Sequence, residues 1–202
     1  MAVLSQRSER SENDREQTFE AVLDATVGLL ATGAAFADLT IGDISTAAGV
    51  SRPTFYAYFR DKRALVLALG HRFEANARAA SADWMSMRVD DVRGTLEAVF
   101  AAFAANRHAL RAVSEAAGYD DEVAGFWRAF HERYMDQVAR RIVGTDPDRS
   151  DEEAEAAAFT LVWMTERSFS EQLQAPRVRE VAMLDAVEHL WNCALPGLSP
   201  NR

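Results

Sequence analysis

Residues 40–63 (TIGDISTAAGVSRPTFYAYFRDKR) constrain the fold of this chain most, because they predict two short helices around a tight turn. Thr40 stands where it would cap the first helix, and Asp43 completes an acidic variant of the capping box. Gly49 follows at the position where glycine adopts the left-handed conformation without steric cost. Ser51 is placed to cap the second helix. The stretch therefore predicts a helix-turn-helix pair.

Such a pair places the first residues of its second helix in the major groove of DNA. Arg52 can donate two hydrogen bonds to a guanine edge, and Lys62 offers a positive charge to phosphate oxygens. Phe55 and Phe59 are interpreted as core residues that tie the short helix to its neighbours. The predicted DNA-binding residues are Thr40, Ser51, Arg52, Thr54, Tyr56, Tyr58 and Lys62.

The charge distribution leaves room for a DNA surface. The whole chain has a net charge of −9. Residues 40–63, in contrast, contain four basic and two acidic side chains. A locally basic face can bind phosphates while an acidic body keeps the protein in solution.

Composition favours an all-α protein of one or two domains. Among the 202 residues, 49% are apolar, which is enough for a sizeable core, and no segment has the pattern of a strand hairpin. The single cysteine, Cys193, excludes an intramolecular disulfide and fits a reducing compartment. No apolar run approaches membrane-spanning length and no secretory signal opens the chain, so we expect a cytoplasmic protein without a membrane partner.

The run 51–59 (SRPTFYAYF), followed by Asp61, Lys62 and Leu65, resembles the DNA-binding domain of the TetR family of transcriptional repressors. The resemblance is closest to the EthR-like branch and is specific over about residues 19–69. Farther along it is looser, and it includes Trp127, the run 164–167 (MTER) and Trp191. It implies a dimeric repressor with an N-terminal three-helix DNA-binding domain and a C-terminal helical domain that holds a small molecule and dimerises.

The chain as a whole predicts about nine helices in three parts. Residues 1–14 are polar and read as a flexible arm, 15–60 as the helix-turn-helix DNA-binding domain, and 61–202 as the helical effector-binding and dimerisation domain. The helix that starts at Asp61 and runs to about Trp84 links the two domains. Its position makes it the expected transmitter of a ligand signal. The other predicted helices run over about 14–32, 108–117, 151–173 and 178–195, with two more starting near 90 and 120.

The C-terminal part is rich in aromatic side chains with polar tips. Ligand pockets are mostly apolar with a few placed polar groups, but aromatic stripes at helical spacing also build ordinary cores, so the residues alone leave both readings open. EthR-like repressors are similar in having an aromatic-lined channel among these helices, and this resemblance implies a pocket for a small apolar or aromatic effector. The predicted ligand-binding residues are Phe100, Phe103, Trp127, His131, Tyr134, Trp163, Thr165, Glu166 and Trp191.

The last two predicted helices carry more apolar residues than one core face needs, which predicts a homodimer through them. A two-fold dimer would present two recognition helices to successive major grooves and favour a palindromic operator. The predicted function is therefore a ligand-responsive regulator, a homodimeric repressor that a small apolar or aromatic effector releases from DNA.

Other functions are weaker readings of the same chain. The four histidines are scattered without ligand-like spacing, and no glycine-rich phosphate loop or nucleophile elbow occurs, so no catalytic residue, metal or cofactor is predicted. A helical small-molecule sensor or carrier that acts through protein partners is the alternative. A constitutive DNA binder with a filled C-terminal body is a third possibility.

Overall fold

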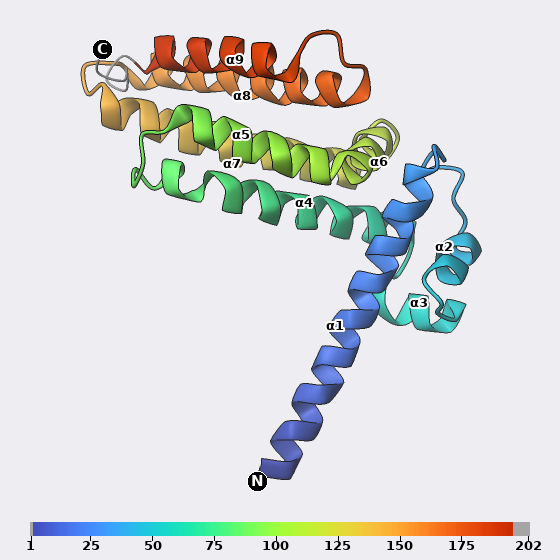
Figure 1. Cartoon of the computed structure of the whole chain (residues 1–202). Helices are drawn as coiled ribbons and strands as arrows, with labels where there is room; N and C mark the ends of the chain where they lie inside the picture. The colour runs from blue at the N-terminus through green and yellow to red at the C-terminus, as the bar shows by residue number, and fades with distance from the viewer. Residues whose placement is uncertain (1, 196–202) are drawn as a thin grey trace. The chain divides into compact units, whose positions relative to one another are not determined.

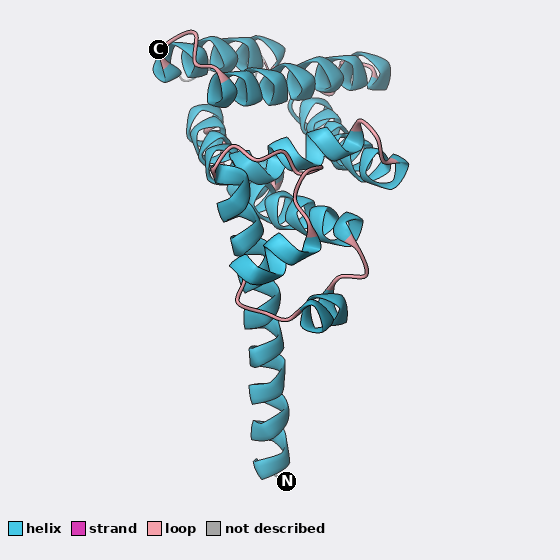
Figure 2. Cartoon of the chain, turned by 90° about the vertical axis from the view of Figure 1, so that its right-hand side faces the viewer, coloured by secondary structure: helices cyan, strands magenta, loops and turns pink. Residues whose placement is uncertain are grey.

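The computed structural model describes residues 2–195, with their side chains from residue 13 onward. These residues form nine α-helices joined by loops and turns, without a strand (Figures 1 and 2). The predicted all-α fold is confirmed. The helices are α1 Ala2–Ala31, α2 Ile41–Ala47, α3 Arg52–Tyr58, α4 Lys62–Met85, α5 Val92–Ala105, α6 Arg107–Ala117, α7 Asp121–Thr145, α8 Asp151–Gln174 and α9 Glu180–Ala194.

The chain divides into two compact units. The first unit combines Met1–His71 with His108–Ala124, and the second combines Arg72–Arg107 with Gly125–Arg202. Helices α4 and α7 contribute to both units, because a unit boundary falls inside each of them. The helix-turn-helix pair therefore shares its unit with almost all of α6. None of the helices among residues 2–195 is long and apolar enough to cross a membrane.

The first helix of the pair is capped as predicted. The Thr40 hydroxyl accepts a hydrogen bond from Asp43 N (3.1 Å), and the Asp43 carboxylate accepts one from Thr40 N (2.9 Å). These reciprocal bonds satisfy two donors at the start of α2 that the helix itself cannot pair. The hydrogen bonds from Thr40, aided by the charge of Arg52, lower the pKa of Asp43.

The turn between the two helices depends on Gly49. Its φ of +67° lies in the left-handed region, which glycine occupies without a steric penalty. Gly49 N donates to Thr46 O (3.2 Å) and Val50 N donates to Ser45 O (3.0 Å), the two hydrogen bonds of a Schellman motif. The chain then starts α3 at once, with Ser51 as its N-cap.

The core of the first unit joins the helix-turn-helix pair to α1 and to the first turns of α4. Phe19 of α1 stacks on Phe59 at a centroid distance of 4.9 Å, and Phe55 lies 5.4 Å from Phe59. Phe55 and Phe59 are fully buried, as predicted. Other buried apolar residues of this core are Val22, Leu23, Leu30, Phe36, Leu39, Ile44, Leu65 and Leu69.

The start of α1 differs from the prediction. Its backbone is helical from Ala2, whereas the sequence analysis began this helix near Asp14 and interpreted residues 1–14 as a flexible arm. Residues 2–14 contain no glycine or proline and include strong helix formers such as arginine, glutamate and alanine. Helix propensity therefore extends α1 beyond its apolar face, which was the only signal used to place its start.

Aromatic side chains dominate the core of the second unit. Phe73 of α4 meets Phe103 of α5 edge to face at 5.0 Å and lies 5.4 Å from Phe130 of α7. Phe100 and Phe103 both approach Phe169 of α8, at 5.0 and 5.8 Å. Figure 1 shows α8 and α9 side by side, joined by residues 175–179, in agreement with their direct contacts.

We predict that Gly49→Ala lowers the free energy of unfolding by about 1–2 kcal/mol, because alanine resists the left-handed conformation. Gly28→Ala is the matched control, since Gly28 lies in α1 with open space where its Cβ would stand. That variant should gain about 0.5–1 kcal/mol. Urea unfolding followed by circular dichroism measures both, and equal effects in the two variants would contradict the role of Gly49.

Candidate functional site

Helix α3 presents the predicted DNA-contacting side chains. Ser51 and Arg52 are exposed, Tyr56 is 54% exposed, and Tyr58 and Thr54 are half-buried. Phe55 and Phe59, between them, point into the core. Helix α3 therefore presents a face of polar side chains to solvent, while Phe55 and Phe59 fix its other face to the core.

Some of these polar groups are already used within the protein. The Ser51 hydroxyl accepts a hydrogen bond from Thr54 N (3.1 Å) and pairs with the Thr54 hydroxyl (2.7 Å). The Thr40 hydroxyl donates to Asp43 (2.6 Å). These three hydroxyls hold the backbone of the pair in place. Arg52 and Tyr56 are the members of the predicted set whose polar ends are most available for base contacts.

Arg52 folds back on α2. Its Nη2 lies 2.5 Å from where a Cβ on Gly42 would stand, so glycine at position 42 makes room for the guanidinium. The same guanidinium contributes to the lowered pKa of Asp43, after the stronger hydrogen bonds from Thr40. The Arg52 guanidinium therefore rests against the start of α2.

Lys62 is anchored to the loop between α1 and α2. Its ammonium donates to Phe36 O (2.8 Å) and Ala37 O (2.9 Å) and lies 4.9 Å from the centre of the Phe36 ring. Partial burial lowers the pKa of Lys62, against the opposing charges of Glu115 and Asp38. Two of its three N–H donors are thus used, which leaves one for the predicted phosphate contact.

Helix α6 holds the same loop from another direction. The Glu115 carboxylate accepts from Ala37 N (2.8 Å) and Phe36 N (3.1 Å). Arg111, one turn earlier, donates to Leu30 O (3.0 Å) and to Ala34 O (2.9 Å). We call Lys62, Arg111 and Glu115 the loop clamp. Sequence analysis missed Arg111 and Glu115, whose spacing of four residues signalled only a shared helix face.

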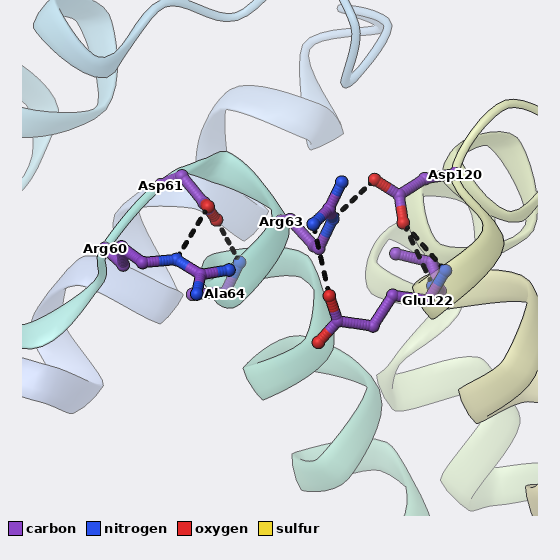
Figure 3. Close-up of polar contacts among 7 residues, drawn as sticks. Arg60, Asp61, Arg63, Ala64, Asp120 and Glu122 are labelled. Atoms are coloured by element: carbon purple, nitrogen blue, oxygen red, sulfur yellow. Dashed lines mark hydrogen bonds and ion pairs between the residues drawn. The ribbon is translucent and has the colours of Figure 1, made fainter.

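The first turn of α4 contacts the start of α7 through Arg63. Its Nε donates to Asp120 (2.6 Å) and its Nη1 to Glu122 (3.1 Å), as Figure 3 shows. The hydrogen bond from Arg63 is the main cause of the lowered pKa of Asp120. The neighbouring Asp61 caps α4 by accepting from Ala64 N (2.8 Å). The first unit therefore holds α4 by ion pairs as well as by apolar contacts.

The second unit contains a partly open apolar cavity of about 80 Å³. Six of the nine predicted ligand-binding residues line it: Phe103, His131, Tyr134, Thr165, Glu166 and Trp191. The sequence analysis missed the contribution of α4 and most of that of α5. The additional lining residues are Ala77, Ser81, Trp84, Met85, Val92, Thr95, Leu96, Val99, Phe130, Val138 and Val162.

The other three predicted residues do not line this cavity. Phe100 packs against Phe169 in the core. Trp127 stacks on Phe130 at 5.1 Å, and Trp163 stacks on His131 at 4.1 Å with 37% of its surface exposed. Trp127 and Trp163 therefore lie outside the cavity lining and pack against Phe130 and His131, which belong to it.

His131 is the most constrained polar residue of the cavity wall. Its Nδ1 lies 2.8 Å from Trp127 O, and the residue is 1% exposed. Because a carbonyl oxygen only accepts, the proton of the neutral ring is assigned to Nδ1. Burial lowers the pKa of His131, against the opposing effects of the hydrogen bond to Trp127 O and of the Glu166 charge. Burial therefore favours the neutral imidazole.

Buried polar atoms without partners gather in this unit. Among the described residues, His131 Nε2, Tyr134 Oη and Trp84 Nε1 are buried without a hydrogen bond, and all three residues line the cavity. Thr165 and Trp191, in contrast, satisfy each other through a bond of 2.8 Å from the indole N–H. In the part of the chain that the structure describes, no group of three or more histidine, cysteine or acidic residues could hold a metal ion.

Helices α8 and α9 expose an apolar surface. Phe159, Val181 and Leu190 are 57%, 58% and 47% exposed. Phe169, Leu184 and Val187 of the same two helices, in contrast, are buried in the core. The surface available to a partner is therefore smaller than the sequence suggested, but it remains on the two predicted helices.

Comparisons with known proteins match both parts of the chain. Residues 92–197 match the family model of the C-terminal domain of the transcriptional regulator EthR, and residues 22–69 match that of bacterial regulatory proteins of the tetR family. Curated relatives include the HTH-type transcriptional regulator EthR of Mycobacterium tuberculosis, 28% identical, with 88% of this chain and 87% of the relative covered. The EthR of Mycolicibacterium smegmatis is also 28% identical, with 96% and 94% covered.

Solved structures show the same fold. Salmonella enterica GusR gives a TM-score of 0.70 at 18% identity, with 89% of this chain and 96% of that chain covered. A TetR-family transcriptional regulator from Streptomyces coelicolor gives 0.65 at 20% identity, with 92% and 97% covered.

We predict that Glu115→Gln lowers the free energy of unfolding by about 1–2 kcal/mol, because an amide offers one acceptor oxygen for two backbone donors and loses the charge. Glu122→Gln, which breaks an exposed ion pair with Arg63, should change stability little. Chemical unfolding of the two variants tests the loop clamp, which is disproved if they are equally stable.

We also predict a smaller loss of thermal stability on acidification in His131→Phe than in the wild type. The folded-state pKa of His131 lies below its ordinary value, so the unfolded chain binds this proton more readily. Stability due to the neutral ring is present above about pH 6.5 and is lost as the pH falls through the folded-state pKa. Melting temperatures from about pH 7.5 to 5 measure the effect; identical pH profiles would show that His131 is not held neutral.

Proposed function

Since the chain belongs to the TetR family of bacterial transcriptional regulators, in its EthR branch, we propose that it is a homodimeric repressor released from DNA by a small effector. It is a regulator and not an enzyme. The proposed organisation assigns DNA binding to residues 15–60 and effector binding and dimerisation to 61–202. The proposed site of action is the cytoplasm, where the chromosome lies.

One observation carries the proposal: helix α4 serves both candidate sites. Its first residue, Lys62, holds the loop that precedes the helix-turn-helix pair. More than four turns along the same helix, Ala77, Ser81 and Trp84 line the cavity. An effector that biases one of two positions of α4 would therefore change the position of the recognition helix.

The DNA contacts are proposed for the exposed face of α3. Arg52 and Tyr56 are assigned to base edges, since their polar ends are available. The other members of the predicted set are assigned to contacts with the DNA backbone or to fixing the helix-turn-helix pair: Thr40, Ser51, Thr54, Tyr58 and Lys62. Arg52 must leave its resting place against Gly42 to reach a base. Because the guanidinium only rests against Gly42, the Arg52 side chain can turn toward a base without a movement of the backbone.

Dimerisation is proposed for the exposed apolar surface of α8 and α9. Two such helix pairs related by a two-fold axis would form a four-helix interface and bury Phe159 and Leu190. The two recognition helices would then read a palindromic operator.

Binding of the purified protein to its own upstream DNA, titrated with salt beside random DNA of equal length, tests the proposal. A repressor prefers the upstream fragment and loses affinity steeply with salt, because phosphate contacts release counterions. A sensor or carrier that acts through protein would bind neither fragment at low salt. A constitutive DNA binder would bind but would not respond to any cavity ligand.

We predict that Arg52→Ala reduces the preference for the upstream DNA over random DNA, at a cost of about 1–3 kcal/mol for the lost base contact. Lys62→Ala should weaken both DNAs alike and reduce the salt slope by about one. Equal, sequence-independent losses in both variants would contradict this division of roles.

We further predict that Phe159→Asp yields monomers, because it places a charge in the centre of the proposed interface. Val178→Asp is the control, since Val178 is 56% exposed but lies in the linker before α9. Sedimentation equilibrium distinguishes them; a dimeric Phe159→Asp protein would move the interface elsewhere.

A further inference from the structure

We propose that Gly42 is a positioning residue for DNA recognition. The bare backbone of Gly42 and the charge of Asp43 hold the Arg52 guanidinium against α2, and Arg52 must be released from this position before it can read a base. The proposal rests on the proposed function in taking Arg52 as a base-reading residue. It goes beyond that function because it gives two residues of α2, which are not predicted to contact DNA, control over the affinity for DNA.

The whole guanidinium, and not only its tip, lies over Gly42. A Cβ atom on this residue would stand 2.5 Å from Nη2, 3.3 Å from Cζ and 3.4 Å from Nε of Arg52. Non-bonded atoms prefer separations of about 3.5–4.0 Å, so a methyl group at this position would overlap the guanidinium. The present position of Arg52 therefore requires glycine at position 42.

The backbone gives no other reason for a glycine here. Gly42 is the second residue of α2, and it is not among the glycines with positive φ in the described part of the chain, which are Gly33 and Gly49. An alanine would fit this backbone and would favour the helix, because glycine is a poor helix former. What the glycine provides is the space that Arg52 fills.

The next residue, Asp43, attracts the guanidinium to this position. Its carboxylate accepts hydrogen bonds from Thr40 N (2.9 Å) and from the Thr40 hydroxyl (2.6 Å), which fix it in place. These bonds lower the pKa of Asp43 and the charge of Arg52 lowers it further, so the carboxylate is ionised at neutral pH. Both side chains are exposed, so their attraction is weak and a good contact with a base can replace it.

Release of Arg52 from Gly42 and Asp43 costs free energy that only a strong contact returns. A bidentate contact with guanine exceeds an exposed ion pair, so Arg52 leaves α2 at an operator. On random DNA, a phosphate contact would only exchange one exposed ion pair for another, so Arg52 gains little by leaving. The contact with α2 therefore keeps the operator affinity below the value that the base contact alone would give, and a smaller bias from an effector is enough for release.

The first measurement tests the position of Arg52 in the full-length protein without DNA. An NMR titration of the Asp43 carboxyl group compares the wild type with Gly42→Ala and Arg52→Ala. Both substitutions should raise the pKa of Asp43, because the first displaces the positive charge from the carboxylate and the second removes it. Gly42→Ala should fold, since the added methyl meets only the end of an exposed, flexible side chain.

The second measurement is a double-mutant cycle on the affinity for the upstream DNA at fixed salt. We expect Gly42→Ala to tighten binding by about two- to fivefold, and to tighten binding to random DNA of equal length by less. In the Arg52→Ala protein the same substitution should have no effect, because no guanidinium remains to be released. Asp43→Asn, whose amide oxygen can keep the cap, should likewise tighten binding more when Arg52 is present than in the Arg52→Ala protein.

Several results would overturn the proposal. Weaker DNA binding by Gly42→Ala would show that Arg52 contacts DNA from its position on α2. An equal gain with and without Arg52 would assign the effect to a stiffer α2. An unchanged DNA affinity, or an unchanged pKa of Asp43, in Gly42→Ala overturns the proposal alone and leaves the proposed function intact. Failure of the wild type to bind either DNA at low salt refutes the proposed function and, with it, this role of Gly42.

Discussion

The peptide groups of Phe36 and Ala37 are held from two sides, and the position of the helix-turn-helix pair depends on this. Their carbonyls accept from the Lys62 ammonium on α4, and their N–H groups donate to the Glu115 carboxylate on α6. A loop is ordinarily the most mobile part of a small helical unit. Here four charge-assisted hydrogen bonds fix it, so a movement of α4 or α6 must be transmitted to the pair or break them. The loop clamp is therefore the step at which a signal along α4 would reach the recognition helix.

The sequence predicted the helix-turn-helix pair well because its determinants are local. The capping box of Thr40 and Asp43 and the left-handed Gly49 involve residues within a few positions of each other, and the structure has them as predicted. The loop clamp could not be predicted in this way. Glu115 lies 78 residues from Ala37 in the chain, and nothing in its neighbourhood distinguishes it from a solvated glutamate. The early start of α1 was missed although its determinants are local. Residues 2–14 favour a helix through their helix propensity, but they have no apolar face that would mark one.

The sequence predicted the aromatic character of the cavity but only some of the residues that line it. Aromatic residues at helical spacing identified α7 and α8, but whether a ring faces a cavity or supports its wall depends on packing. Trp127 and Trp163 were predicted to line the cavity, whereas they pack against residues that line it. Ser81 and Trp84 were missed, because the sequence analysis treated α4 as a link and not as a wall. The buried polar atoms of His131 and Tyr134 that lack a hydrogen bond could not be recognised from the sequence, because the lack of a partner depends on packing.

Thermodynamic coupling between the cavity and the DNA-binding face is the central proposal, and linkage tests it most directly. We would measure the affinity for the upstream DNA at fixed salt while a small apolar compound, shown by calorimetry to bind the protein, is raised to saturation, and then the affinity for that compound with and without the DNA. Coupling requires the compound to weaken DNA binding and the DNA to weaken binding of the compound by the same factor. A DNA affinity that stays constant while calorimetry shows the protein saturated with the compound would contradict the coupling.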